Sequence, residues 1–223
     1  MWSHDIEQFD LDRYLREPRK GKKMASLRKG TVIFSEGDEN NSVFFVFDGA
    51  IKFTKHSPNG KEAILGLVDG GSFFGAACVV NGFPQRSYRA VALSDVHLAV
   101  IERPAMIHLL QISEGTLYCF LAYLLSSVSE LQESLASNLL YPAGQRLART
   151  LVSLAQLKAD SPVQRSFPEL GQEDLAQMIG ATRQHVNSYL MKFRSLGHIE
   201  YKRGLKSFRV NKSMAKIVGP KGP

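Results

Sequence analysis

The stretch Gln172–Phe193 reads QEDLAQMIGATRQHVNSYLMKF and holds two helical patterns on either side of Gly180. Each half carries apolar residues at helical spacing, which gives each helix one face that can be buried. Gly180 lies where the chain must turn with positive φ, which glycine tolerates without steric cost. Thr182 is a suitable N-cap for the second helix. The pattern predicts a helix-turn-helix with the inner face Leu175, Ala176, Ile179, Val186, Tyr189, Leu190 and Phe193.

The outer face of the second helix is polar, and its residue types suit nucleic acid. Arg can form two hydrogen bonds with guanine and Gln or Asn two with adenine, whereas Ser and Lys suit phosphates. The free amides at the helix N-terminus also favour a phosphate. We expect this helix to enter the major groove of DNA through Thr182, Arg183, Gln184, Asn187, Ser188 and Lys192. The alternative is a helical hairpin without a role in DNA binding.

Two further features of the C-terminal region agree with this prediction. Segments 199–201 and 207–210 flank Lys202-Arg203-Gly204, a pattern typical of the wing of a winged helix, and we expect Lys202 and Arg203 to contact phosphates. Residues 141–223 hold 14 Lys and Arg against 5 Asp and Glu, a balance of +9, which leaves 14 against 16 in the first 140 residues. This asymmetry is typical of a sensing domain joined to a polyanion-binding domain, although charge alone also fits a solvated basic surface.

A long helix with a regular apolar stripe is predicted upstream. Its apolar residues are spaced by 4, 3, 4, 3 and 4 positions, and they are Leu117, Leu121, Leu124, Val128, Leu131 and Leu135. This heptad pattern favours a seam that pairs with the same helix of a second copy, whereas the alternative is a helix buried within one chain. Phe120 and Leu125 widen the stripe near its start, where we expect the helix also to pack on the preceding domain. Pro142 and Gly144 break the helix and mark a hinge before a shorter helix at 145–158.

Residues from about Leu27 to Ile101 predict a domain of short strands separated by turns. The run Val43–Phe47 is wholly apolar and ends at a turn signal, Asp48-Gly49. Further strands are expected at 51–54, 63–68, 88–93 and 96–101. Strands at this spacing are typical of an antiparallel sandwich or jelly roll.

Several classes of function lack support in the sequence. Cys78 and Cys119 are far apart among apolar neighbours, which favours two buried thiols over a disulfide or a metal site. The six histidines show no ligand spacing and no catalytic motif is recognisable, so we predict no catalytic residues, no metal and no enzyme. No apolar run approaches the roughly 20 residues of a membrane span. Because the N-terminal region also lacks the apolar core of a secretory signal, we expect a cytoplasmic protein without membrane contact.

The order of these parts, and many residues within them, resemble the Crp–Fnr family of bacterial transcription regulators. The resemblance extends from about Leu27 to Val210 and implies an α+β fold: an N-terminal antiparallel β jelly roll, a long dimerisation helix and a C-terminal winged helix-turn-helix. The expected boundaries are an N-terminal segment at 1–26, a cyclic-nucleotide-binding-like effector domain at 27–110, the dimerisation helix at 111–141 and the DNA-binding domain at 142–223. Besides the helix-turn-helix stretch, the residues that carry the resemblance are Gly30, Ile33, Phe34, Glu36-Gly37-Asp38, Gly49, Gly60-Lys61-Glu62, Gly71, Phe74-Gly75 and Arg86-Ser87.

The resemblance also implies an effector site formed by Phe74, Gly75, Ala76, Arg86 and Ser87. In cyclic-nucleotide-binding members such a loop holds the cyclic phosphate. By resemblance, Arg86 would form an ion pair with this phosphate and Ser87 would donate a hydrogen bond to it. This chain departs from the pattern at Ala76, where those members carry a Glu that binds the ribose hydroxyl. It also departs at Leu131 and Gln132, where the long helix would contact the base. Three alternatives stay open: a cyclic nucleotide such as cAMP or cGMP, another small anion, or a vestigial pocket without a ligand.

Taken together, these features predict a homodimeric, sequence-specific regulator. We expect it to bind a pseudo-palindromic operator in double-stranded DNA and, by resemblance, to act on RNA polymerase. Control by a small anion in the β domain is one interpretation, and a constitutive regulator is another. A third interpretation is a cyclic-nucleotide domain that signals through partner proteins, which the basic winged helix disfavours.

Overall fold

The computed structural model describes residues 10–159, 170–201 and 208–218. The chain forms two compact units, one comprising residues up to 55 together with 66–131, the other 132–223 together with 56–65. The first unit is built mainly from strands and the second mainly from helices. The predicted α+β fold class is therefore confirmed.

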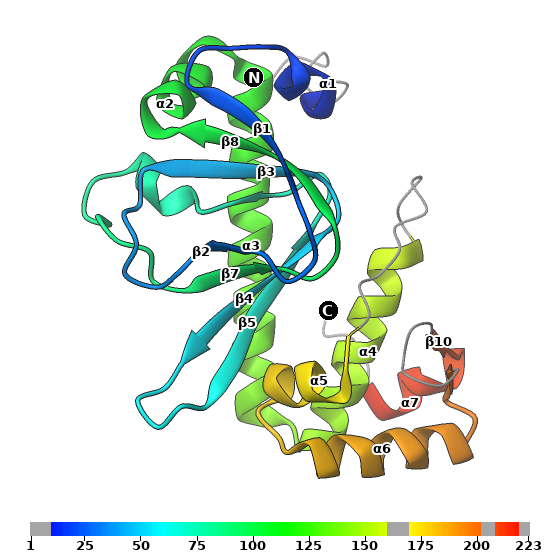
Figure 1. Ribbon diagram of the computed structural model, residues 1–223. Helices are drawn as coiled ribbons and strands as arrows, with labels where there is room; N and C mark the ends of the chain where they lie inside the picture. The colour runs from blue at the N-terminus through cyan, green and yellow to red at the C-terminus, as the bar shows by residue number, and fades with distance from the viewer. Residues whose placement is uncertain (1–9, 160–169, 202–207, 219–223) are drawn as a thin grey trace. The chain divides into compact units, whose positions relative to one another are not determined.

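Within the described residues, the first unit is a roll of two four-stranded sheets with antiparallel pairing (Figure 1). One sheet has the order β1-β8-β3-β6 and the other the order β2-β7-β4-β5. The strands are β1 (Lys22–Leu27), β2 (Val32–Phe34), β3 (Ser42–Asp48), β4 (Ala50–His56), β5 (Glu62–Asp69), β6 (Phe73–Phe74), β7 (Arg89–Ala92) and β8 (Val96–Glu102). The antiparallel β domain expected from the sequence is confirmed, and β1 precedes the first strand that the sequence pattern indicates.

Strand β3 shows why this sequence forms layers. Successive side chains of a strand point to opposite faces, and in β3 both faces are buried. Phe44 belongs to a core between the two sheets, together with Phe34 and Phe74. Phe45 belongs to a second core on the other face of its sheet, where Phe120 of the long helix also packs. The wholly apolar run therefore serves two cores at once.

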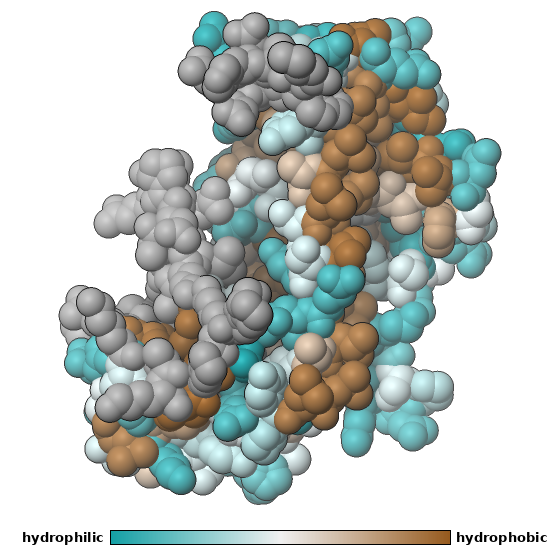
Figure 2. Space-filling model, turned by 180° about the vertical axis from the view of Figure 1, so that it is seen from behind, coloured by the Kyte–Doolittle hydropathy of each residue, from teal (hydrophilic) through white to brown (hydrophobic). Residues whose placement is uncertain are grey.

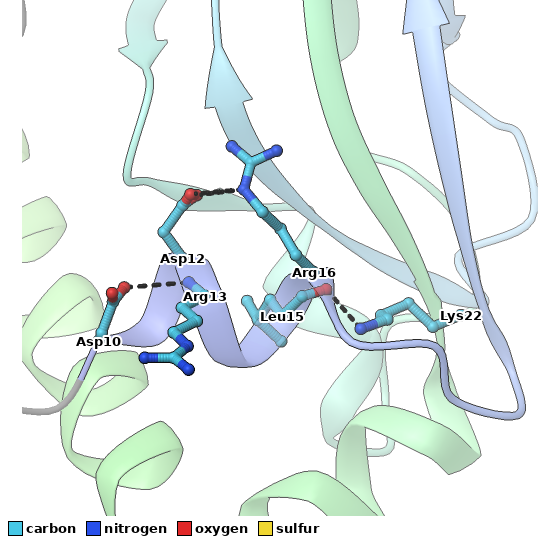
Figure 3. Close-up of polar contacts among 6 residues, drawn as sticks. All are labelled: Asp10, Asp12, Arg13, Leu15, Arg16 and Lys22. Atoms are coloured by element: carbon cyan, nitrogen blue, oxygen red, sulfur yellow. Dashed lines mark hydrogen bonds and ion pairs between the residues drawn. The ribbon is translucent and has the colours of Figure 1, made fainter.

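Helix α1 (Leu11–Arg16) closes one end of this second core. The Asp10 carboxylate caps the helix by accepting a 2.9 Å hydrogen bond from the Arg13 amide (Figure 3). Leu15 is fully buried in the core. The Lys22 ammonium donates to the Leu15 carbonyl, which ties the end of α1 to the start of β1 (Figure 3). Burial lowers the pKa of Lys22.

Two helices follow the roll. They are α2 (Arg103–Ile112) and α3 (Glu114–Leu140), and the chain bends by 114° between them. Among the residues that the structure describes, no single helix is long and apolar enough to cross a membrane, although α2 and α3 taken together reach the required length and composition. α3 lies within the boundaries expected for the long helix and begins at Glu114.

The second unit contains the helix-turn-helix. Its elements are α4 (Ala143–Ala159), α5 (Gln172–Ile179), α6 (Arg183–Ser195), β9 (Ile199–Tyr201), β10 (Phe208–Val210), a 3-10 turn η3 (Lys212–Met214) and α7 (Ala215–Val218). Leu147, Leu151 and Leu154 of α4 are buried, as expected for the helix predicted at 145–158. Pro142 lies between α3 and α4, where the break was predicted.

Candidate functional site

The turn between α5 and α6 has the geometry that its sequence predicts. Gly180 adopts φ 61° and ψ 39°, in the left-handed region. The Ala181 amide donates to the Ala176 carbonyl at 3.0 Å, which closes the turn. The Thr182 hydroxyl accepts a 3.3 Å hydrogen bond from the His185 amide and so caps α6. The predicted helix-turn-helix and its N-cap are confirmed.

The inner faces of α5 and α6 form one core with α4. The buried members are Leu175, Ala176, Ile179, Val186, Leu190 and Phe193, all expected from the sequence. Tyr189 is half-buried, and a Cβ added to Gly144 would lie 2.9 Å from its ring. Gly144 lies inside α4 rather than in the break before it. Its role is therefore close packing against Tyr189, whereas the sequence interpretation made it part of a hinge.

The outer face of α6 is open to solvent. Every residue predicted there is exposed: Thr182, Arg183, Gln184, Asn187, Ser188 and Lys192. The same face carries Met191, which is 61% exposed and was not singled out from the sequence. A thioether at this position can make apolar contact with a thymine methyl group. The sequence pattern did not mark Met191 as a surface contact, because Met is usually a core residue.

A side chain of α5 reaches across to this face. The Gln172 side-chain amide donates a 3.0 Å hydrogen bond to the Asn187 side-chain oxygen. The Asn187 amide nitrogen lies 3.9 Å from the Met191 sulfur, so its donors face along the exposed surface. Gln172 thus fixes which way the Asn187 amide points. No sequence signal could have found this pair, because the two residues lie on different helices.

Two arginines of α4 hold the second unit together at its start. The Arg146 guanidinium donates to the carbonyl of Ile179 at 3.0 Å and to that of Tyr141 at 2.9 Å. Arg149 forms a 2.7 Å ion pair with Glu133 of α3, and its guanidinium lies 4.0 Å from the centre of the Tyr141 ring. These arginines therefore join the end of α3, the break and the end of α5. This role could not be predicted from the sequence, since an Arg on an amphipathic helix is usually solvated.

Strands β9 and β10 pair in antiparallel register, with Ile199 opposite Val210 and Tyr201 opposite Phe208. This is the strand pair that flanks the predicted wing. Lys202 and Arg203, the expected phosphate contacts, lie outside the described residues.

Helix α3 has two adjoining apolar faces. One faces the roll: Phe120 is buried in its core, and Leu124 packs against that core. The other face is exposed, and Figure 2 shows hydrophobic residues gathered along a band on this side of the molecule. The exposed residues are Leu121, Leu125, Val128, Leu131, Leu135, Leu139 and Leu140, whereas Leu117 is half-buried. The sequence placed Leu125 toward the preceding domain, but it is 69% exposed.

The loop that carries Arg86 is held by main-chain bonds. The Gly37 amide donates to the Arg86 carbonyl at 2.9 Å, and the Arg86 amide donates to the Asp38 carbonyl at 2.8 Å. The Asn40 amide donates to the Pro84 carbonyl at 2.9 Å. Gly37 has φ 89°, a conformation that favours glycine. Gly37 and Asp38, which belong to the residues that carry the family resemblance, therefore fix the backbone of Arg86.

The Arg86 side chain points into the roll and is only 5% exposed. Its guanidinium donates to the Gly75 carbonyl at 3.1 Å, the Ser42 carbonyl at 2.7 Å and the Ser42 hydroxyl at 3.2 Å. It also lies 4.3 Å from the centre of the Phe34 ring and 5.3 Å from that of Phe44. Burial lowers the pKa of Arg86. Carbonyl dipoles and aromatic faces thus surround the positive charge, while the buried Nε has no hydrogen-bond partner among the described residues.

Aromatic rings fill the space beside this arginine. The Phe44 and Phe74 ring centres are 4.7 Å apart, and the Tyr88 ring lies 4.8 Å from Phe53 and 5.3 Å from Phe34. The Tyr88 hydroxyl accepts a 3.3 Å hydrogen bond from the Gly75 amide. Burial, the largest cause, raises the pKa of Tyr88 to about 12. The phenol is therefore neutral, and its ring packs against the core between the two sheets.

The structure brings three of the five predicted effector residues together. Phe74 and Gly75 are buried next to Arg86. Ala76 begins a 3-10 turn, η2 (Ala76–Val79), and its methyl group offers no hydrogen-bond acceptor. Ser87 is exposed, and its carbonyl accepts from the Lys55 ammonium at 3.1 Å.

The remaining reactive side chains carry no site in the described residues. Cys78 is buried and Cys119 half-buried, both thiols are free, and burial raises the pKa of each. Among the residues that the structure describes, no three His, Cys, Asp or Glu side chains lie together in a way that could hold a metal ion.

A β-roll with a long helix, followed by a helix-turn-helix with an exposed polar face, defines a two-domain transcription regulator. Comparison with known proteins agrees. The model of the cyclic nucleotide-binding domain matches residues 24–113, and that of the Crp-like helix-turn-helix domain matches residues 145–212. The chain belongs to the Crp–Fnr family.

Individual relatives are distant. The CRP-like cAMP-activated global transcriptional regulator of Mycobacterium tuberculosis is 26% identical over 177 residues, which cover 77% of each chain. The structure of FixK2 from Bradyrhizobium japonicum superposes with a TM-score of 0.76 at 17% identity, over 90% of this chain and 99% of that one. TTHB099, a transcriptional regulator of the CRP family from Thermus thermophilus, gives a TM-score of 0.71 at 19% identity, over 88% and 97%. The two structures support the fold, and the regulators among the relatives are not enzymes.

Proposed function

We propose that this protein is a homodimeric transcription regulator that binds a pseudo-palindromic operator in double-stranded DNA. The observation that carries the proposal is the division of α6 into a buried apolar face and a wholly exposed polar face. A helix packed this firmly can present its side chains to a groove without rearrangement. Each α6 would enter the major groove at its N-terminal end, the usual geometry of a recognition helix.

We assign two roles to the residues of this unit that the sequence predicts to contact DNA. Arg183, Gln184 and Asn187 read base edges, since their side chains offer paired or directional hydrogen bonds. Thr182, Ser188, Lys192, Lys202 and Arg203 contact phosphates, which position the protein without reading sequence. RNA polymerase is a further partner that family membership supports.

The dimer would form along the exposed apolar face of α3. Leu131 and Leu135 are each 61% exposed in the single chain, and several leucines and a valine share this face. Pairing with the same helix of a second copy buries them around a two-fold axis. Leu124 adds less to this seam than the heptad pattern predicts, because it also packs on the roll.

An effector of DNA binding would be held by the β-roll. The match to the cyclic nucleotide-binding model supports cAMP or cGMP as effector, and the M. tuberculosis relative is named as cAMP-activated. The contacts of Arg86 instead favour the second candidate, a regulator that needs no cyclic nucleotide. A domain that signals only through protein partners is disfavoured, because the exposed face of α6 would then have no role.

Selection of binding sites from random double-stranded DNA tests this proposal. We expect an enriched pseudo-palindrome whose half-sites are one helical turn apart, about 34 Å. Fluorescence anisotropy should then give affinity for the selected site well above that for scrambled DNA. Enrichment of no sequence, or binding as a monomer to one half-site, would contradict it.

A further inference from the structure

We infer that the β-roll of this protein is closed by its own side chains, and that Arg86 is a structural clamp rather than a receptor for the phosphate of a cyclic nucleotide. The inference rests on the proposed function, because it concerns what controls DNA binding. It predicts that neither cAMP nor cGMP is needed for operator binding.

The first argument is that both terminal nitrogens of the guanidinium are already engaged, although its buried Nε has no hydrogen-bond partner among the described residues. One arginine joins three parts of the chain: its own loop, Gly75 beyond β6, and Ser42 at the start of β3. A phosphate that took these donors would leave two buried carbonyls, those of Gly75 and Ser42, without their arginine partner. Buried polar groups are seldom left in that state.

The second argument is that the space beside the loop glycine is occupied. A Cβ added to Gly75 would lie 2.5 Å from the nearer terminal nitrogen of Arg86 and 3.2 Å from the Phe44 ring. The Gly75 amide, a donor that a phosphate could use, already donates to the Tyr88 hydroxyl. The amide and the carbonyl of Gly75 therefore both have partners within the protein.

The third argument concerns the sugar and the base. Ala76 stands where cyclic-nucleotide-binding members carry an acidic residue, and it offers no acceptor for a ribose hydroxyl. Leu131 and Gln132, at the helix positions expected to contact the base, are both exposed in the single chain. The ribose and base positions therefore depart from the pattern of cyclic-nucleotide-binding members, and at the phosphate position the terminal nitrogens of Arg86 are engaged by the protein.

Thermal unfolding of the full-length protein tests the inference directly. A ligand that binds only the folded state, added at roughly 100 times its Kd, raises the unfolding midpoint by roughly 5–10 °C for a protein of this size. We expect no shift with cAMP or cGMP at about 1 mM. Arg86→Lys should lower the midpoint by roughly 5–10 °C with no nucleotide present, because an ammonium group cannot reproduce the planar fork. Arg28→Lys, at an exposed site in the same unit, is the matched control and should leave the midpoint unchanged.

A second variant guards against misfolding of the first. Ala76→Glu restores the missing carboxylate and keeps Arg86, and we expect calorimetry to detect no cAMP or cGMP binding to it. A saturable nucleotide signal in the wild type, or one gained in Ala76→Glu, would overturn the inference. So would an Arg86→Lys protein as stable as the wild type.

Operator affinity measured in the same preparations separates this inference from the proposed function. Tight binding to the selected site without nucleotide agrees with both. Binding that appears only with cAMP or cGMP would overturn the inference and leave the proposed function standing. Absence of sequence-specific binding under every condition would contradict the proposed function, while the thermal titration would still decide the role of Arg86.

Discussion

The interior of the β-roll and the outer face of α6 each carry an arginine at a position that the family resemblance marks, yet the two are in opposite states. Arg86 is 5% exposed and donates to buried carbonyls, whereas Arg183 is exposed at the start of α6. The same side chain is a structural element in one region and an available contact in the other. A motif gives the position of a residue in the fold, but the partners of its side chain decide whether a ligand can use it.

The two regions also differ in how their polar groups are satisfied. In the roll, the Gly75 amide and carbonyl both have side-chain partners. On α6 the polar side chains are exposed, whereas the opposite face of the helix is packed in the core of the second unit. Binding DNA therefore requires little reorganisation of the protein. This difference is why we place specific recognition on α6 and not in the roll.

The largest expected effect comes from separating the two copies of α6. Leu131→Lys with Leu135→Lys places like charges in the seam of α3 and should give a monomer by light scattering. Operator affinity should fall by roughly 100-fold or more, because two half-sites no longer bind as one unit. Ser126→Lys with Ser134→Lys, on the polar side of α3, is the matched control. A leucine double variant that remains dimeric would show that the seam lies elsewhere.

Substitutions on α6 test whether Arg183 is available to DNA and separate base readout from phosphate contact. Arg183→Ala should cost about 1–3 kcal/mol on the selected operator and relax the preference at one base pair, with the unfolding midpoint unchanged. Lys192→Ala, a change at a proposed phosphate contact, should weaken all sequences alike and flatten the salt dependence. If Arg183→Ala left the base preference intact, the reading face of α6 would be wrongly assigned.

The smallest expected effect comes from removing the hydrogen bond between Gln172 and Asn187 on the α6 face. Gln172→Ala removes the hydrogen bond that orients Asn187 and should cost about 0.5–1.5 kcal/mol on the operator. The loss should be confined to the base pair that Asn187 reads. In the Asn187→Ala background the same change should have no further effect on base preference, which a double-mutant cycle measures. An equal loss in both backgrounds would mean that Gln172 contacts DNA independently.

Local patterns predicted much of the fold. The apolar run of β3 and the glycine turn at Gly180 each act over a few residues, so the sequence alone determines them. The inner and outer faces of α6 follow from helical spacing for the same reason. Thr182 was recognisable as a cap because capping depends on residue type and position only.

Features that depend on tertiary packing could not be predicted. The heptad pattern of α3 did not show that Leu124 also packs on the roll while Leu125 is exposed, because one helix has two apolar faces. The orientation of Asn187 by Gln172 joins two helices. Likewise, Arg86-Ser87 could be placed in the effector loop by resemblance, but not the direction in which the Arg86 side chain points.

The most direct test of the central claim is selection of operator sites from random DNA by the full-length dimer, performed in parallel without nucleotide and with cAMP. We predict the same pseudo-palindrome in both selections, with half-sites about 34 Å apart. A palindrome enriched only with cAMP would contradict the closed roll. Failure to enrich any palindrome would contradict the assignment of α6 as the recognition helix of a dimer.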